Sequence, residues 1–95
     1  MNKLIESIER GKVRGIEECK LIDGERYCYQ YALKKIANKY VTYLFFIPES
    51  KMDVMEDYGS EEIKEFFSIT DAINYFTSIG VDVSLFRPIK GVLPF

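Results

Sequence analysis

Hydrophobic and polar residues alternate along much of the first half of the chain, and two short turn-forming pairs interrupt the alternation. Asp23-Gly24 lies between runs of β-branched and aromatic residues, and a pair that tolerates positive φ at such a place is a strong hairpin signal. Ala37-Asn38 forms a second tight connection, and Pro48 ends the run that follows because proline cannot donate to a strand ladder. The pattern predicts an antiparallel three-stranded meander over residues 12–22, 25–36 and 39–47.

The helical period is clearest after residue 68, where a helix is predicted over 69–79. Ser68 and Asp71 resemble a capping box at its start. Gly80 fits the left-handed residue after its end, and Val81 is placed for the apolar contact that accompanies such an ending. The stripe that this helix is expected to bury consists of Ile69, Ala72, Ile73, Phe76 and Ile79.

The remaining segments complete an α+β fold. Residues 2–10 form a short amphipathic helix, and 49–60 form an acidic loop with at most one helical turn. Residues 62–67 are either a fourth strand or the last turn of a helix, and we favour the strand. A short strand is predicted over 81–86, and the apolar tail 87–95 is expected to dock on the core or on a neighbouring molecule. All 95 residues are interpreted as one domain, a three- to four-stranded antiparallel meander packed against one main C-terminal helix, with a short N-terminal helix.

Strand side chains point alternately to two faces, so the two turns decide which residues share a face. With two-residue turns, paired residue numbers sum to 47 in the first hairpin and to 75 in the second. One face is then Gly15, Cys19, Leu21, Cys28, Ala32, Val41, Phe45 and Ile47. The other is Ile16, Tyr27, Tyr29, Tyr31, Leu33, Leu44 and Phe46. We expect the helix over 69–79 to pack on the first face, with Phe45 and Phe76 in one core, whereas a bulge at Gly24 would exchange the faces of the first strand.

The tyrosine-bearing face has two interpretations, because tyrosine buries its ring while its hydroxyl needs a polar partner. It is a second layer of core under the N-terminal helix and the C-terminal tail, or it is an exposed aromatic platform for a partner chain or for nucleobases. Apolar groups on this face and in the tail exceed what one helix can cover. The predicted partner-binding residues are therefore Tyr27, Tyr29, Tyr31, Val92, Leu93 and Phe95.

Cys19 and Cys28 are the two cysteines of the chain, and they face each other across the first hairpin. Counted from the turn, they occupy a non-hydrogen-bonded pair, where the Cα atoms come close enough for a disulfide. We nevertheless expect two free thiols beneath the helix, because a reducing cytoplasm keeps thiols reduced. Zinc is disfavoured because the chain has no histidine, and no C-x-x-C motif indicates a redox site.

The composition is that of a folded protein without recognisable catalytic equipment. Hydrophobic residues make up 47% of the chain and the net charge is −2, which excludes general disorder. The absence of histidine excludes Ser–His and Cys–His nucleophilic pairs, and no glycine motif for phosphate binding is present. No apolar run is long enough to span a bilayer, and the first residues do not read as a signal peptide. We expect a cytoplasmic protein that is not an enzyme, with no cofactor, no metal and no membrane contact.

Charge is distributed unevenly, with nine basic and six acidic residues in 1–40 but seven acidic and two basic residues in 49–65. A three-stranded antiparallel sheet followed by a helix resembles small β-sheet DNA readers. In that alternative the phosphate contacts are Arg14, Lys20, Arg26 and Lys34. Acids interspersed among these residues weaken the basic field that nucleic acid requires. We therefore favour a protein–protein interaction or regulatory module that acts as a homodimer or binds another protein.

Overall fold

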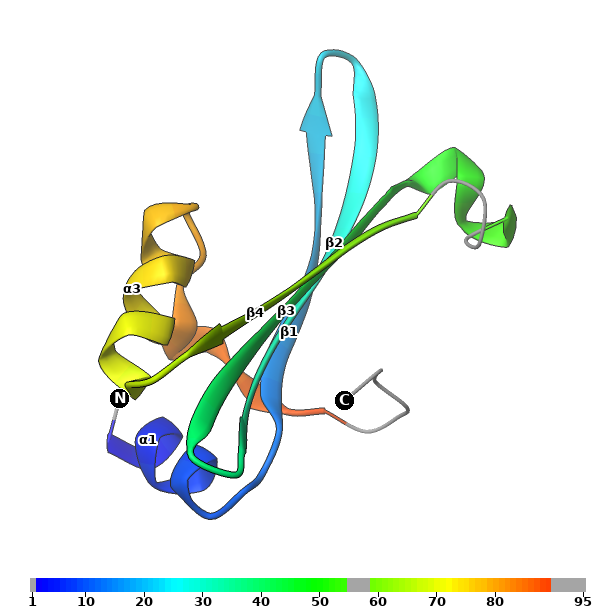
Figure 1. The fold of residues 1–95 in the computed structure, drawn as a ribbon. Coiled ribbons are helices and arrows are strands. Elements are labelled where there is room, and N and C mark those ends of the chain that lie inside the picture. The colour runs from blue at the N-terminus through cyan, green and yellow to red at the C-terminus, as the bar shows by residue number, and fades with distance from the viewer. Residues whose placement is uncertain (1, 55–58, 90–95) are drawn as a thin grey trace.

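The computed structural model describes residues 2–54 and 59–89, which form an α+β fold (Figure 1). In chain order the elements are α1 (Asn2–Glu9), β1 (Arg14–Ile22), β2 (Glu25–Ile36), β3 (Lys39–Pro48), the 3₁₀ helix η1 (Glu49–Val54), β4 (Ser60–Phe66), α3 (Ile69–Ser78), the 3₁₀ helix η2 (Val83–Leu85) and β5 (Arg87–Pro88). The strands pair antiparallel in the order β4-β3-β2-β1-β5. The predicted meander, its fourth strand and both predicted α-helices are confirmed.

The two hairpin turns set the register of the sheet. Asp23 and Gly24 have φ of 51° and 82°, and Ala37 has φ of 55°, so both turns use left-handed residues as tight hairpins require. Cys19 is consequently paired with Cys28, whose residue numbers sum to 47, and Lys34 is paired with Val41, whose numbers sum to 75, as predicted. The alternative with a bulge at Gly24 is wrong, since the pairing runs without a break from the turn to Arg14–Leu33.

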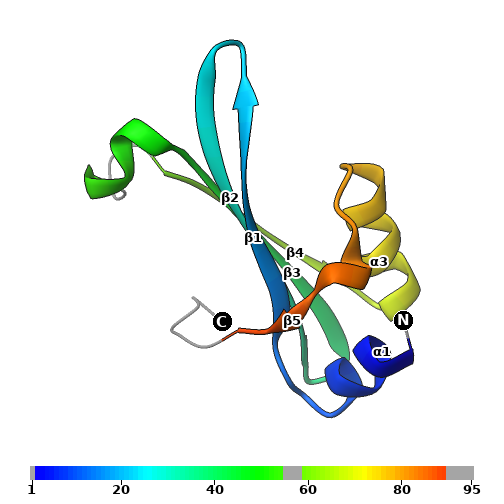
Figure 2. The same cartoon turned by 180° about the vertical axis from the view of Figure 1, so that it is seen from behind.

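Both α-helices pack on the tyrosine-bearing face of the sheet (Figures 1 and 2). The core there is formed by Leu4, Ile8, Ile16, Tyr31, Leu33, Tyr40, Ala72, Phe76, Val81 and Val83. The prediction that the second helix covers the cysteine-bearing face is therefore wrong, and Phe45 does not share a core with Phe76. The reason is volume: the larger aromatic and aliphatic side chains lie on the tyrosine face, and covering them removes more apolar surface from water.

The ends of α3 explain its position in the sequence. The Ser68 hydroxyl accepts a hydrogen bond from the Asp71 N–H at 3.1 Å. At the other end Gly80 has φ of 85°, and the Gly80 and Val81 N–H groups donate to the Thr77 and Phe76 carbonyls. This pattern is a Schellman ending, and it brings Val81 into the core as predicted.

Tyrosine hydroxyls fasten both helices to the sheet. The Tyr40 hydroxyl on β3 donates to Glu9 of α1 at 2.7 Å, and the Tyr75 hydroxyl on α3 donates to Glu62 of β4 at 2.6 Å. These bonds lower the pKa of Glu9 and of Glu62, because they stabilise the ionised carboxylates. Burial, reinforced by the Glu62 carboxylate, raises the pKa of Tyr75 to about 12. The aromatic rings are thus buried while their hydroxyls reach charged partners at the rim.

The segment after Gly80 differs from the strand that the sequence predicts over 81–86. Asp82 Oδ1 accepts hydrogen bonds from the Ser84 N–H at 3.0 Å and from Ser84 Oγ at 2.5 Å. This local bond uses a backbone donor that a strand would need, and the residues form η2 instead. In the described part of the chain after Gly80, the residues that pair with β1 are Arg87 and Pro88. The predicted turn within 49–60 is η1, and residues 55–58 lie outside the described part of the chain.

The core position of Phe76 leads to a stability prediction. Its side chain has no exposed area and packs against the rings of Tyr31 and Phe86. We expect Phe76→Ala to lower the free energy of unfolding by about 3–5 kcal/mol, measured by urea denaturation at a dilution that keeps the chain monomeric. The matched control is Phe67→Ala, at a side chain that is 84% exposed, with an expected change within about 0.5 kcal/mol. Equal losses in both variants would contradict the placement of α3.

Candidate interaction surface

The sheet has a second face that neither α1 nor α3 covers, here called the open face. The register assigns to it Gly15, Glu17, Cys19, Leu21, Arg26, Cys28, Gln30, Ala32, Lys34, Ile36, Lys39, Val41, Tyr43, Phe45, Ile47, Glu61, Ile63, Glu65 and Arg87. Ile89 extends over its β1 side, since a side chain at Gly15 would collide with Ile89 and with the Tyr31 carbonyl. The open face is therefore the candidate surface for a partner.

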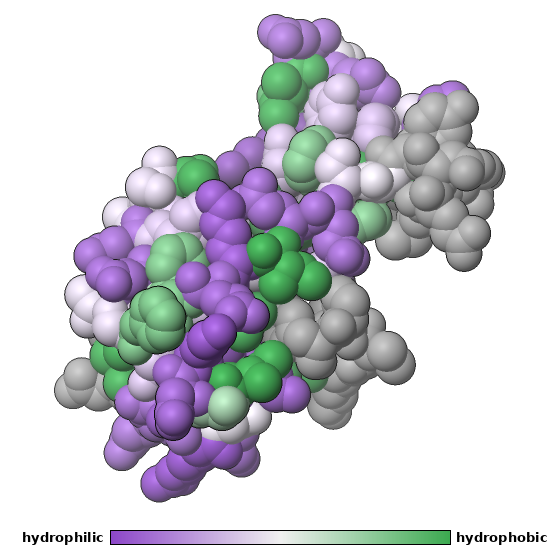
Figure 3. Space-filling view, viewed as in Figure 1, coloured by the Kyte–Doolittle hydropathy of each residue, from purple (hydrophilic) through white to green (hydrophobic). Residues whose placement is uncertain are grey.

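The open face is apolar at its centre and keeps large hydrophobic groups exposed at its margin. Val41, Tyr43 and Ile47 are buried in the middle of the sheet. At the margin, Leu21 is 75% exposed and Ile63 is 45% exposed. Figure 3 shows hydrophobic side chains along the sheet on the side of β4 that faces away from α3. Exposed apolar groups that adjoin a buried apolar centre are typical of an interaction surface.

Polar groups on the open face are arranged by strand. Glu61 and Glu65 lie on β4, whereas Gln30 and Lys34 lie in the same rows on β2. The Tyr43 hydroxyl between them donates to Glu61 at 3.3 Å. Burial, together with this carboxylate, raises the pKa of Tyr43 to about 12, so its hydroxyl stays a donor at neutral pH.

Lys34 has an unusual environment for a lysine. It is half-buried beside Val41, and among residues 2–54 and 59–89 it has no ion-pair partner. Glu65, two strands away in the same row, holds Lys39 at 3.0 Å. A carboxylate has lone pairs for more than one donor. The row therefore carries a basic group at one side and an acidic group at the other.

Cys19 and Cys28 form a disulfide across β1 and β2, with Cα atoms 4.0 Å apart. The pairing across the hairpin is confirmed, and the expectation of two free thiols is contradicted by this structure. The expected position beneath a helix is also wrong, since Cys19 is exposed on the open face. The disulfide, Phe45 and Ile47 line a small apolar hollow of about 150 Å³. Glu17 and Glu18 of β1 also line this hollow.

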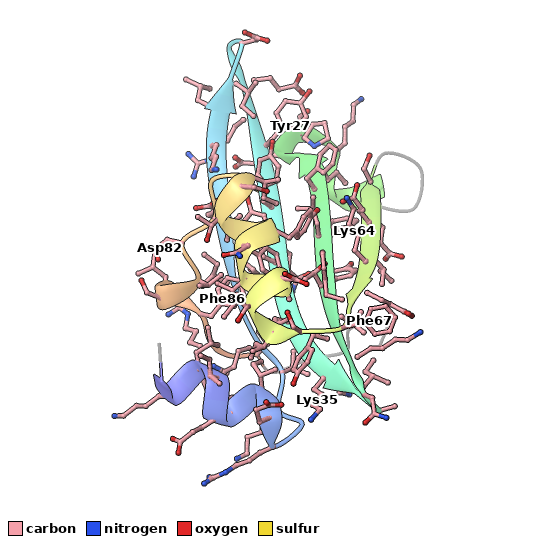
Figure 4. The ribbon with its side chains drawn as sticks, turned by 60° about the vertical axis from the view of Figure 1, so that its left-hand side comes forward. Tyr27, Lys35, Lys64, Phe67, Asp82 and Phe86 are labelled. Carbon is pink, nitrogen blue, oxygen red and sulfur yellow. A yellow bond between two sulfur atoms is a disulfide. The ribbon has the colours of Figure 1, made fainter. Side chains whose placement is uncertain are left out.

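The structure separates the residues that the sequence assigns to partner binding. Tyr31 lies in the core, where its hydroxyl donates to Glu18 at 3.1 Å, and burial raises its pKa. Tyr29 packs against that core and stacks on Tyr31 and Phe46. Tyr27 is half-buried and lies beyond the C-terminal end of α3 (Figure 4). The tyrosine face is thus the second-layer alternative, a core covered by α1, as predicted, and by α3. Val92, Leu93 and Phe95 lie outside the described residues.

The four basic residues of the nucleic-acid alternative do not share a surface. Arg14 and Lys20 point to the face of the helices, whereas Arg26 and Lys34 point to the open face. Lys20 is paired with Glu18 at 3.1 Å and Arg26 with Glu49 at 2.7 Å. A nucleic acid bound on one face of this sheet could therefore contact at most two of these four cations.

The sequence predicted the open-face residues of β1, β2 and β3 in part, but not those of β4. The residues Ile63, Glu61 and Glu65 were missed because β4 was expected without a register. Their signal is the alternation Glu-x-Ile-x-Glu in 61–65, which places an apolar residue between two acids on one face of a strand.

No group of three or more cysteine or acidic side chains in the described part of the chain is arranged to hold a metal ion. No helix among those residues is long and apolar enough to cross a membrane. The chain matches no protein-family model, no curated protein and no solved structure in the comparisons made.

The disulfide leads to a prediction about stability. It closes a loop across a sequence separation of 9, and such a loop restricts the unfolded chain. We expect reduction to lower the free energy of unfolding by about 2–3 kcal/mol. Urea denaturation with and without dithiothreitol measures this change. The double variant Cys19→Ser, Cys28→Ser serves as control, because its stability should not respond to the reductant. An unchanged wild-type midpoint after complete reduction would contradict the prediction.

Proposed function

We propose that the chain is a protein-interaction module that self-associates through its open face. The observation that carries this proposal is the self-complementary arrangement of charge around an apolar centre on that face. A catalytic role is not proposed, because the described surface offers a patch of apolar and paired charged groups rather than a nucleophile with a base. The nucleic-acid alternative is not favoured, because its four cations divide between two faces.

The geometry of two facing sheets determines which residues would meet. A two-fold axis parallel to β3 and midway between two open faces places β4 of one copy over β2 of the other. Rotation about such an axis keeps every residue row at its own height along the strands. Glu65 of one copy would therefore lie over Lys34 of the other, and Glu61 over Gln30. Sheets pack about 10 Å apart, a gap that these long side chains can bridge.

This arrangement supports a second copy as the partner. The contact of Lys34 with Glu65 occurs twice in a symmetric pair, and it would supply the half-buried lysine with a carboxylate. The apolar side chains on and beside β3, including Phe45 and Ile63, would lie at the centre of the contact. Two-fold symmetry requires a patch to be complementary to itself, and an acidic strand and a basic strand on either side of β3 have this property.

A charge-reversal experiment tests the proposal. We expect Lys34→Glu to weaken self-association at least about tenfold, because each of the two contacts then sets like charges against each other. Glu65→Lys alone should weaken it similarly, and the double variant should recover most of the wild-type affinity. Sedimentation velocity over a wide range of protein concentration measures the monomer–dimer equilibrium.

Two further variants complete the design. Lys12→Glu makes the same change of charge at an exposed residue between α1 and β1, and it should leave the equilibrium unchanged. Ile63→Glu places a charge on β4 between the contact residues Glu61 and Glu65 and should abolish association. A wild-type chain that stays monomeric at every concentration would refute the proposal. Equal effects of Lys12→Glu and Lys34→Glu would show that net charge, rather than this face, controls association.

The cytoplasmic location expected from the sequence stays a prediction, and the Cys19–Cys28 bond weighs against it. Disulfides persist mainly in oxidising compartments. We expect the bond to be intact in the native cell, so that protein alkylated before lysis carries no blocked thiol by mass spectrometry. Two alkylated cysteines would instead support the cytoplasmic location and would make the reduced hairpin the working form.

A further inference from the structure

A basic groove is lined by residues of α1, η2 and β5 and by Arg14 of β1, elements that lie close together in Figure 2. Its volume is about 770 Å³, within the range of small-molecule sites. Lys3, Arg14 and Arg87 contribute three positive charges to its lining, and no described acidic residue lines it. The groove thus gathers three positive charges around one hollow.

Among the described residues, Lys3, Arg14 and Arg87 lack acidic partners, as Arg10, Lys12 and Lys34 also do, but these three cations line one groove. Ion pairs occupy Lys20, Arg26, Lys35, Lys39 and Lys64. None of the ion pairs found between described residues includes Lys3, Arg14 or Arg87. Three like charges that converge on one hollow repel each other, and an anion bound between them would relieve this repulsion.

Arg14 is held in place at the floor of the groove. Its Nη1 donates to the Val13 carbonyl at 2.9 Å, and its Nη2 donates to Ser7 Oγ at 3.3 Å. Both acceptors are neutral, so they orient the guanidinium without cancelling its charge. A guanidinium fixed in this way loses little freedom on binding and presents its remaining donors to a carboxylate or phosphate. Ser7 accepts from Arg14 and keeps its own hydroxyl proton to donate.

Asp82, two residues before Ser84 of the groove lining, is already engaged. Asp82 accepts both the N–H and the hydroxyl of Ser84, and these bonds lower its pKa. Its carboxylate is therefore committed to the turn of η2. An external anion would be the available partner for the three cations.

One wall of the groove is apolar. Leu4 and Pro88 line it together with Phe86, which lies between α1 and α3 (Figure 4) and packs edge-on against Phe76. A fully hydrated inorganic ion would leave this wall in contact with water. A ligand that carries a compact apolar group beside its charge would cover it.

We propose that this groove binds a small amphipathic anion, with a carboxylate or phosphate head on Arg14, Arg87 and Lys3 and a ring or short hydrocarbon against Leu4 and Phe86. The site does not depend on self-association, because its lining shares no residue with the contacts proposed on β2, β3 and β4. Phenyl phosphate and benzoate represent the two possible heads on one apolar group. Inorganic phosphate and phenol represent the head and the apolar group alone.

Isothermal titration calorimetry of the full chain with these four probes tests the proposal. We expect phenyl phosphate or benzoate to bind, with shifts of the backbone amide signals of Ser7, Arg14 and Arg87 in NMR spectra. Arg87→Gln and Arg14→Gln should each weaken binding at least about tenfold, the loss of one charge-assisted contact. Arg87→Gln is the more informative variant, since Arg87 is exposed and supports no other described side chain.

Arg10→Gln is the matched control, because Arg10 is an exposed arginine without an ion pair that does not line the groove. Its binding should stay within about twofold of wild type. Equal affinity for inorganic phosphate and phenyl phosphate would overturn the role of the apolar wall. Absence of binding by all four probes, or equal losses in Arg10→Gln and Arg87→Gln, would overturn the site.

Discussion

The register of the β2-centred sheet is the constraint on which the rest of the structure depends. Two two-residue turns, both with left-handed residues, fix it at Asp23-Gly24 and at Ala37. A slip by one residue would send every side chain of a strand to the other face. Tyrosines and leucines would then face the cysteines' side, and neither helix would find a continuous apolar surface. The positions of α1, α3 and the disulfide are all consequences of these turns.

Once the register is set, the chemistry of tyrosine decides which face the helices cover. Rings of Tyr31 and Tyr40 supply large buried areas, and their hydroxyls reach Glu18 and Glu9 at the rim of the core. A buried tyrosine without such an acceptor would pay a desolvation penalty. The carboxylates placed next to the core therefore allow a tyrosine-rich face to serve as an interior. The same pairing recurs on the open face between Tyr43 and Glu61.

Local signals predicted the elements well and their packing less well. Asp23-Gly24, Ser68 and Gly80 act within a few residues, so the hairpin and both ends of α3 could be read from the sequence. The face that α3 covers is decided by contacts distant in sequence, and comparing residue sizes along single strands did not reveal it. The oxidation state of Cys19 and Cys28 depends on the compartment as well as on geometry. The basic groove brings together residue 3, residue 14 and residue 87, and no sequence spacing indicates that meeting.

Unlike the apolar centre of the open face, the edge strands of the sheet carry charged side chains. β4 is an edge strand with Glu61, Glu62, Lys64 and Glu65, and the unpaired part of β1 carries Glu17, Glu18 and Lys20. Charged side chains along a strand discourage a further strand from adding its backbone, as happens in fibrils. A neighbour that docks on the face adds no strand, and a two-fold pair uses up the surface that it is made from. If two copies associate as proposed, the pair would therefore be closed: its charged edges would resist lengthening of the sheet, and no further copy could join through the open face.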